Sequence, residues 1–353
     1  DLRRRGICLA AAALSLSPSA PPLYIMWRGG KPMLVVQKFG GSSLAGPERL
    51  RRAANICLDA RKRGNDVVLV VSAMGNTTDD LEDIALKISA SPPAREMDAL
   101  MTTGEQQSAA LMAIMLESLG APARSFAGWQ AGLFTDRRHG DARISVIAPG
   151  RINAALAEGV TPVVSGYQGV SSSGDVTALG RGGSDTTAVA LAAALGADKC
   201  EIYTDVDGIY TADPRLIKDA RKLARIDYRD MLRLARAGSQ VLHPRSVELA
   251  LLERVELALK GSFADGGGSL VCALAESERP DFAGVTRSVQ DREVSLVGRA
   301  ASAEVLSALV QRLGESGIQV LGGSVSEGCV AVKVAPSQLD DALLTAHGFV
   351  GKV

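Results

Sequence analysis

The sequence predicts an α/β fold, a three-layer αβα sandwich with a mainly parallel sheet, followed by a small α+β domain. Strand–helix units repeat along the chain, with polar glycine-rich turns at the strand ends. Continuous apolar runs such as Val67 to Val71 are typical of central parallel strands. From Gly284 the pattern changes to strand, helix, strand, strand and helix, which indicates a separate small module.

The composition excludes several classes of function. The 353 residues include 39 basic and 39 acidic side chains, so no net charge favours nucleic acid or an anionic membrane. Aromatic residues are only 4% of the chain, too few for base-stacking platforms. The five scattered cysteines and three histidines argue against a disulfide framework or structural zinc. After the first 30 residues no apolar run approaches the ~18 residues that span a bilayer. We therefore expect a cytoplasmic protein.

The domain boundaries follow from changes in composition. Residues 1–32 begin with a basic segment and a short apolar run, typical of a signal peptide, a plastid transit segment or upstream read-through before Met26 or Met33. We expect this extension to be disordered or not native. We expect a catalytic domain over 33–262, a linker over 263–283 and a single regulatory module over 284–353.

The first strand, expected over Met33 to Phe39, leads directly into Gly40-Gly41-Ser42-Ser43 and a helix from about Pro47. Glycines let backbone N–H groups approach a phosphate closely, and Lys38 offers a point charge. A strand followed by a glycine turn is also common in α/β proteins without a ligand. Both interpretations stay open on these residues alone.

Polar residues then follow the strand at 67–71, after a helix over Glu48 to Arg63. Because ligands of parallel sheets bind at the carboxyl ends of strands, Ser72 and Thr78 are candidates for substrate contacts. Helices are expected over 79–90 and 97–119, and a strand over 160–167. Inside the second helix, Glu105 either caps a helix start or binds a substrate ammonium.

The turn Gly180 to Asp185 feeds an alanine-rich helix, and a strand over Cys200 to Tyr203 follows it. A helix N-terminus at a glycine turn favours anions, and Arg181 adds a planar fork for a carboxylate or phosphate. Asp185 is a carboxylate where anions should bind, so it requires a lysine or a metal nearby. Downstream, Tyr210 and Arg215 suit stacking on a base and contact with phosphate.

Seven motifs, in this order and spacing, resemble those of aspartokinases in the amino-acid kinase superfamily. They are KFGGSS, VSAMGNTT, TTGEQ, TDRRHGDARI, TALGRGGSD, YTDVDGIYTADPR and VLHPRS. The resemblance runs from Met33 to about Ser262, and the C-terminal module resembles an ACT domain. It implies transfer of the ATP γ-phosphoryl group to the β-carboxylate of L-aspartate, giving 4-phospho-L-aspartate, the first step of lysine, threonine and methionine biosynthesis.

The resemblance also implies roles for individual residues. Lys38 would stabilise the transferring phosphoryl group, and Asp185 would orient Lys38. Aspartate recognition is implied for Ser72, Thr78, Glu105, Asp136, Arg181, Gly182, Gly183 and Ser184. ATP binding is implied for Lys38, Phe39, Gly40, Gly41, Ser42, Thr204, Asp205, Tyr210, Arg215 and Gln240. Mg²⁺ would be carried on ATP oxygens, with no all-protein metal site.

Two departures from the family pattern modify these expectations. Gln240 stands where the family normally has a lysine, which predicts ATP binding weaker by ~1–3 kcal/mol. The C-terminal region has room for one ACT unit, which predicts weak or absent feedback by lysine or threonine. We expect a homo-oligomer. The alternatives are a catalytically weak homologue that binds amino acids as a regulatory subunit, or a sibling kinase acting on another carboxylate, carbamate or UMP.

Overall fold

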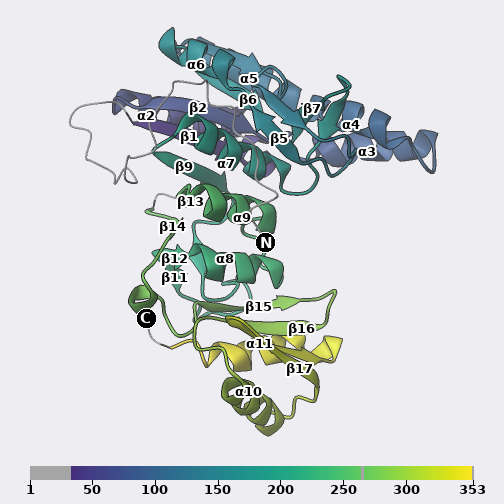
Figure 1. The fold of residues 1–353 in the computed structure, drawn as a ribbon, viewed down its shortest axis with the longest axis vertical. Coiled ribbons are helices and arrows are strands. Elements are labelled where there is room, and N and C mark those ends of the chain that lie inside the picture. The colour runs from purple at the N-terminus through teal and green to yellow at the C-terminus, as the bar shows by residue number, and fades with distance from the viewer. Residues whose placement is uncertain (1–32, 264–265, 352–353) are drawn as a thin grey trace, which may run out of the picture. The chain divides into compact units, whose positions relative to one another are not determined.

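The computed structural model describes residues 33–263 and 266–351 (Figure 1). The chain divides into two compact units, residues 1–200 and 201–353. The division falls within strand β9 (Lys199–Thr204). The expectations for residues 1–32 lie outside the described residues.

The central strands of the first unit run parallel in the order β1-β2-β6-β3. They are β1 (Leu34–Phe39), β2 (Asp66–Val71), β6 (Thr161–Ser165) and β3 (Ala123–Phe126). In β2, five consecutive apolar residues are buried, as a strand covered on both faces requires. The expected parallel sheet is confirmed, and β1, β2 and β6 end at the same edge.

Helices cover both faces of this sheet, which completes the three layers (Figure 1). Helix α7 (Gly183–Leu195) packs on β1, while α2 (Pro47–Lys62) and α5 (Thr103–Ser118) pack on β2 and on each other. The side chain of Lys38 reaches α7, so strand alternation directs its neighbours Gln37 and Phe39 to the opposite face.

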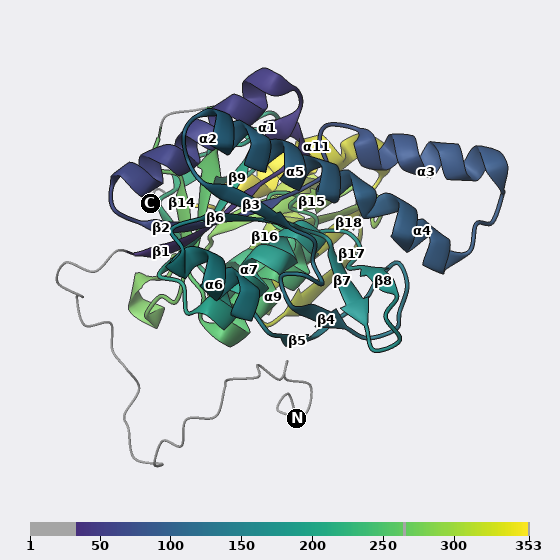
Figure 2. The ribbon, with the colours of Figure 1, turned by 90° about the horizontal axis from the view of Figure 1, so that it is seen from above.

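The helix expected over 97–119 is interrupted at Thr102. It forms α4 (Ala94–Met101) and α5, and Figure 2 shows α4 beside α3 (Thr77–Ile88) as a helical hairpin. The Thr102 hydroxyl donates to the Asp98 carbonyl at 2.7 Å, and the Thr102 carbonyl accepts from Gln168 Nε2 at 2.9 Å. Because these bonds compete with the helix ladder, the chain breaks here and Glu105 lies in the first turn of α5.

A second, four-stranded sheet of the first unit was not expected from the sequence. Its order is β5 (Ile144–Ile147), β4 (Leu133–Thr135), β7 (Gln168–Ser171) and β8 (Val176–Ala178). The strand expected over 160–167 ends earlier, at Ser165, because Tyr167 adopts a left-handed φ of 68° before β7 begins. The short helices α1 (Gly41–Leu44) and α6 (Gly150–Ala157) complete the unit.

The second unit begins with a hairpin and three further strands. The hairpin pairs β10 (Ile209–Tyr210) with β11 (Lys222–Leu223). Strand β14 (Ser269–Cys272) pairs with β12 (Arg225–Asp227) and β13 (Leu257–Gly261), beside helices α8 (Tyr228–Arg236) and α9 (Pro244–Glu253). The segment 263–283, expected to be a linker, therefore contains a paired strand.

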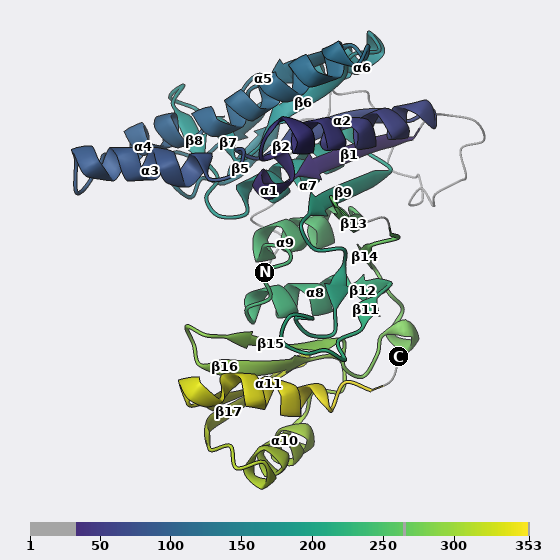
Figure 3. The same cartoon turned by 180° about the vertical axis from the view of Figure 1, so that it is seen from behind.

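The C-terminal module, residues 284–351, is a four-stranded antiparallel sheet with two helices (Figure 3). Its strands, in sheet order, are β15 (Gly284–Ser288), β16 (Glu293–Val297), β18 (Cys329–Val334) and β17 (Val320–Ser326). Helices α10 (Ala303–Glu315) and α11 (Leu339–His347) pack on it. The small α+β domain is confirmed, with β15 as a strand that the sequence pattern did not show. No helix of the described residues is long and apolar enough to cross a membrane.

Candidate functional site

The carboxyl ends of the central strands carry a buried ion pair. Lys38, near the end of β1, places Nζ 2.6 Å from Oδ1 of Asp185 in the first turn of α7. The two side chains are only 11% and 14% exposed. The carboxylate at the glycine turn thus has the lysine partner that its position required. Such a pair orients an ammonium group for contact with a phosphoryl oxygen.

The backbone around this pair is packed so closely that glycine is required. Gly182 precedes α7 with a φ of 74°, a conformation that side chains disfavour. A Cβ on Gly183 would lie 2.9 Å from the Tyr167 ring, and one on Gly41 would lie 2.5 Å from the Ala73 carbonyl oxygen. The turns after β1 and before α7 therefore bring backbone close to the sheet edge.

Glu105 is a buried carboxyl with one unused oxygen. It is 4% exposed, and its Oε1 accepts a hydrogen bond from the Ala73 N–H at 3.1 Å. Oε2 is buried and has no hydrogen-bond partner in the described part of the chain. Burial raises the Glu105 pKa to about 7, because the Ala73 N–H offsets only part of the desolvation. A buried acceptor without a donor indicates a ligand that supplies one.

The remaining substrate candidates lie on the same elements. Ser72 follows β2 and Thr78 is in the first turn of α3, and both are half-buried. Ser184, in the first turn of α7, is buried against Gly166. Arg181 is exposed and has no ion-pair partner among residues 33–263 and 266–351. Its guanidinium is available to an anion.

Asp136 makes contacts that shape its own loop. Its Oδ1 accepts the backbone N–H groups of Arg138 at 3.2 Å and Arg143 at 3.1 Å. Oδ2 lies 3.3 Å from Nε of Arg138. These contacts order the loop that carries Asp136, and its substrate role stays a prediction.

Sequence reasoning missed the residue that fixes this loop to α4. Asp98 is 2% exposed and accepts from the Gly140 N–H at 2.9 Å, and its Oδ2 lies 2.7 Å from Nδ1 of His139. The loop in turn packs on the turn before α7, since the Gly140 carbonyl oxygen lies 2.8 Å from a Cβ built on Gly180. The sequence did offer one signal for Asp98, since it is an aspartate flanked by apolar residues within a predicted helix.

Half of the residues assigned to nucleotide binding lie in the second unit. The Thr204 hydroxyl donates to Asp205 Oδ1 at 2.9 Å at the end of β9. Arg215 forms a paired contact with Asp213, with Nη2 2.8 Å from Oδ2. Gln240, between α8 and α9, is exposed.

Tyr210 belongs to a small polar cluster. Its hydroxyl donates to Asp207 Oδ1 at 2.9 Å, and Nζ of Lys222 lies 5.8 Å from the centre of its ring. Lys222 also pairs with Asp207. Because β11 lies next to β10, Lys222 is a cation beside the predicted base-stacking ring that the sequence did not identify.

The described residues contain no group of three or more side chains arranged to hold a metal ion. Of the carboxylates near the sheet edge, Asp185 pairs with Lys38, and Glu105 uses Oε1 to accept from the Ala73 N–H. The donor set therefore fits a magnesium ion bound mainly by nucleotide oxygens and water.

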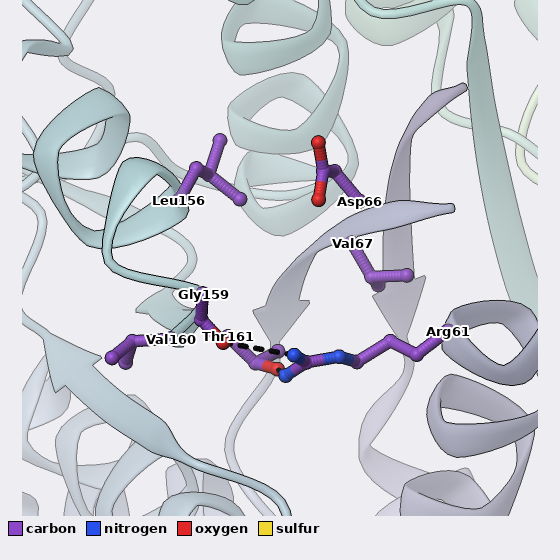
Figure 4. Close-up of a pocket in the computed structure, with 7 residues that line it drawn as sticks. All are labelled: Arg61, Asp66, Val67, Leu156, Gly159, Val160 and Thr161. Atoms are coloured by element: carbon purple, nitrogen blue, oxygen red, sulfur yellow. Dashed lines mark hydrogen bonds between the residues drawn. The ribbon is translucent and has the colours of Figure 1, made fainter. Parts of the chain in front are cut away.

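Figure 4 shows a hollow at the other end of the strands, lined by Arg61, Asp66, Val67, Leu156, Gly159, Val160 and Thr161. Arg61 donates to the Gly159 carbonyl at 2.8 Å and to the Thr161 hydroxyl. Asp66 and Thr161 begin β2 and β6, whereas Lys38 lies near the end of β1. The hollow is therefore separate from the Lys38–Asp185 ion pair. The guanidinium of Arg61 in the hollow is already bonded to protein groups.

Comparison with known proteins agrees with this geometry. The sequence model of the amino acid kinase family matches residues 33–257. The chain belongs to the amino acid kinase family. The aspartokinase of Corynebacterium efficiens is 52% identical over 269 residues, which are 75% of this chain and 64% of that protein. The chain thus matches less than two thirds of the length of this relative.

The fold is similar to that of solved aspartate kinases. The aspartate kinase of Synechocystis has a TM-score of 0.63 at 36% identity, covering 88% of this chain and 54% of that one. E. coli aspartokinase III, solved with aspartate and ADP, has a TM-score of 0.65 at 26% identity, covering 85% and 78%. The same enzyme solved with lysine and aspartate has a TM-score of 0.66 at 26% identity, covering 86% and 79%.

Proposed function

We propose that this chain is an aspartate kinase that transfers the ATP γ-phosphoryl group to the β-carboxylate of L-aspartate. The product would be 4-phospho-L-aspartate, the first intermediate towards lysine, threonine and methionine. The relatives named aspartokinase support this proposal, as does the aspartate and ADP complex of E. coli aspartokinase III.

The observation that favours an amino acid as the substrate is the buried Oε2 of Glu105, which has no partner in the described chain. A carboxyl oxygen that lacks a donor in a desolvated site is suited to an ammonium group. A free amino acid supplies that ammonium, whereas UMP, carbamate or a simple dicarboxylate does not. Arg181, exposed and without an ion-pair partner in the described chain, is suited to a carboxylate of the same ligand. Ser72, Thr78, Ser184 and the Gly182–Gly183 backbone complete the proposed substrate shell.

The phosphoryl step needs alignment and charge stabilisation more than proton transfer. The aspartate β-carboxylate, with a reference pKa of ~3.9, is already ionised at neutral pH, so no general base is required. Lys38, held by Asp185 at 2.6 Å, would stabilise the negative charge on the transferring group. The glycine turn at residues 40–42 and the α7 N-terminus add backbone N–H groups.

For the nucleotide, we propose Phe39, Gly40, Gly41 and Ser42 in the first unit and Thr204, Asp205, Tyr210, Arg215 and Gln240 in the second. Tyr210 would stack on the base, and Arg215 would contact phosphate after exchanging part of its pairing with Asp213. Magnesium supplies charge neutralisation when it is bound with ATP. We extend the proposal to a cytoplasmic homo-oligomer in which an amino-acid effector at the C-terminal module, lysine or threonine, gives weak or absent feedback.

Substrate comparison tests the proposal. Purified protein with MgATP would be given L-aspartate, succinate or N-acetyl-L-aspartate, and the acyl phosphate would be trapped with hydroxylamine as a hydroxamate. We expect hydroxamate from L-aspartate and little from the two analogues without an ammonium. Equal yield from succinate would contradict the role of Glu105. Binding of L-aspartate without any turnover would favour the alternative, a regulatory homologue.

A further inference from the structure

The segment that carries Tyr210 and Arg215 is built into the C-terminal module. Ala212 and Ile217 are 4% and 3% exposed and belong to the apolar core formed by the module's strands and helices. That core also contains Leu309 of α10 and Leu343 of α11. Two residues of the nucleotide segment therefore fill the interior of the module.

Thr211 provides the polar contacts between this segment and the C-terminal module, and it is fully buried. Its carbonyl accepts from the Val285 N–H of β15 at 2.8 Å, and its N–H donates to the Arg221 carbonyl at 2.9 Å. Its hydroxyl oxygen accepts from the Arg221 N–H at 3.0 Å and lies 3.0 Å from Nε2 of His347, the last residue of α11. Backbone and side chain are thus both bonded to neighbours in the second unit.

The backbone of β15 packs closely against Thr211. A Cβ on Gly284 would lie 2.8 Å from the Thr211 carbonyl oxygen. Arg221 also reaches the carbonyl oxygens of Val350 and Gly351 beyond α11. A shift of α11 or β15 would therefore displace Thr211, which directly follows Tyr210 in the chain.

We propose that the C-terminal module forms part of the nucleotide site, and that the Thr211–His347 contact positions Tyr210 and Arg215 for ATP. This inference rests on the proposed function, since it assigns those two residues to the nucleotide. His347 and Thr211 act as positioning residues through Tyr210. Donor and acceptor in the Thr211–His347 contact depend on the imidazole tautomer, and burial lowers the His347 pKa, which favours the neutral ring.

Three variants of the full chain test this proposal. Thr211→Val removes the hydroxyl at nearly constant volume, and Thr211→Ser restores it. Ser302→Ala is the matched control, because it removes the N-cap of α10 in the same module without touching residues 209–221. The measurements are MgADP affinity by calorimetry, KM for ATP and for aspartate, and hydrogen exchange of residues 209–221.

We expect Thr211→Val to weaken MgADP binding and raise the ATP KM about three- to tenfold, with little change in the aspartate KM. Exchange at 209–221 should rise in the same variant. Thr211→Ser and Ser302→Ala should keep the wild-type ATP KM. Unchanged exchange or unchanged MgADP affinity in Thr211→Val would overturn the inference. A wild-type protein that binds no MgADP would instead overturn the proposed function.

Discussion

Oε1 of Glu105 accepts the Ala73 N–H at 3.1 Å, while Oε2 of the same carboxyl is buried without a partner among residues 33–263 and 266–351. Desolvation outweighs the stabilisation of the carboxylate by the backbone N–H groups of Ala73 and Glu105, so the Glu105 pKa rises from 4.5 to about 7. The free protein therefore favours the protonated acid, whereas an ammonium ligand favours the carboxylate. Glu105 therefore affects the stability of the free protein through its raised pKa, and it affects ligand binding through the loss of its proton.

The first prediction concerns stability. Because the folded-state pKa is raised, the protonated form contributes stability below about pH 4.5 that is lost as the pH rises through about 7. At pH 8 the ionised carboxyl destabilises the free protein by about 3 kcal/mol. Glu105→Gln should raise the Tm at pH 8 and change it little at pH 4.5. An equal change at both pH values would contradict the raised pKa.

The second prediction concerns protons released on binding. Near pH 7 about half of the free protein carries a proton on Glu105, and an ammonium beside Oε2 should expel it. Aspartate binding should then release about half a proton per site. Calorimetry in buffers of different ionisation enthalpy measures this number. In Glu105→Gln the release should vanish, and an unchanged release there would assign the proton to another group.

The third prediction concerns the carboxylate that holds Lys38. Asp185→Asn keeps the side-chain shape but removes the charge 2.6 Å from Nζ. We expect kcat to fall about ten- to hundredfold, with the aspartate KM near the wild-type value.

The matched control for Asp185→Asn is Asp198→Asn. Its Oδ2 accepts the Leu34 N–H at 2.8 Å at the beginning of β1, far along the strand from Lys38. It should leave kcat unchanged. Equal losses in the two variants would indicate a general effect on β1.

The fourth prediction concerns Gln240, which is exposed between α8 and α9. A lysine there would add a charge-assisted contact to ATP phosphate. Gln240→Lys should tighten ATP binding by about 1–3 kcal/mol, measured as the ATP Kd. The aspartate Kd should not move. An unchanged ATP Kd would show that position 240 does not reach the phosphates.

The regular parts of the fold were predictable because local patterns determine them. The apolar run of β2 and the alanine-rich α7 have the expected positions, and after β15 the C-terminal module has the expected order of strands and helices. The charge argument predicted a lysine or a metal beside Asp185, and Lys38 is that lysine.

The features that sequence reasoning missed depend on contacts between distant residues. The break at Thr102 requires Gln168, which is 66 positions away. The loop contacts of Asp98 with His139 and Gly140 join segments about 40 residues apart. The burial of Ile217 in the core of the C-terminal module requires strands that follow it by more than 60 residues. None of these contacts leaves a periodic signal.

The most direct test of the account is aspartate-dependent ADP release by the wild-type protein and by Lys38→Ala, with MgATP in both. The account predicts release that requires L-aspartate and falls by about 10²–10³-fold in the variant, because the charge that stabilises the transferring group is removed. Release that does not depend on L-aspartate, or that survives in Lys38→Ala at the wild-type rate, would contradict the assignment of this site as an aspartate kinase centre.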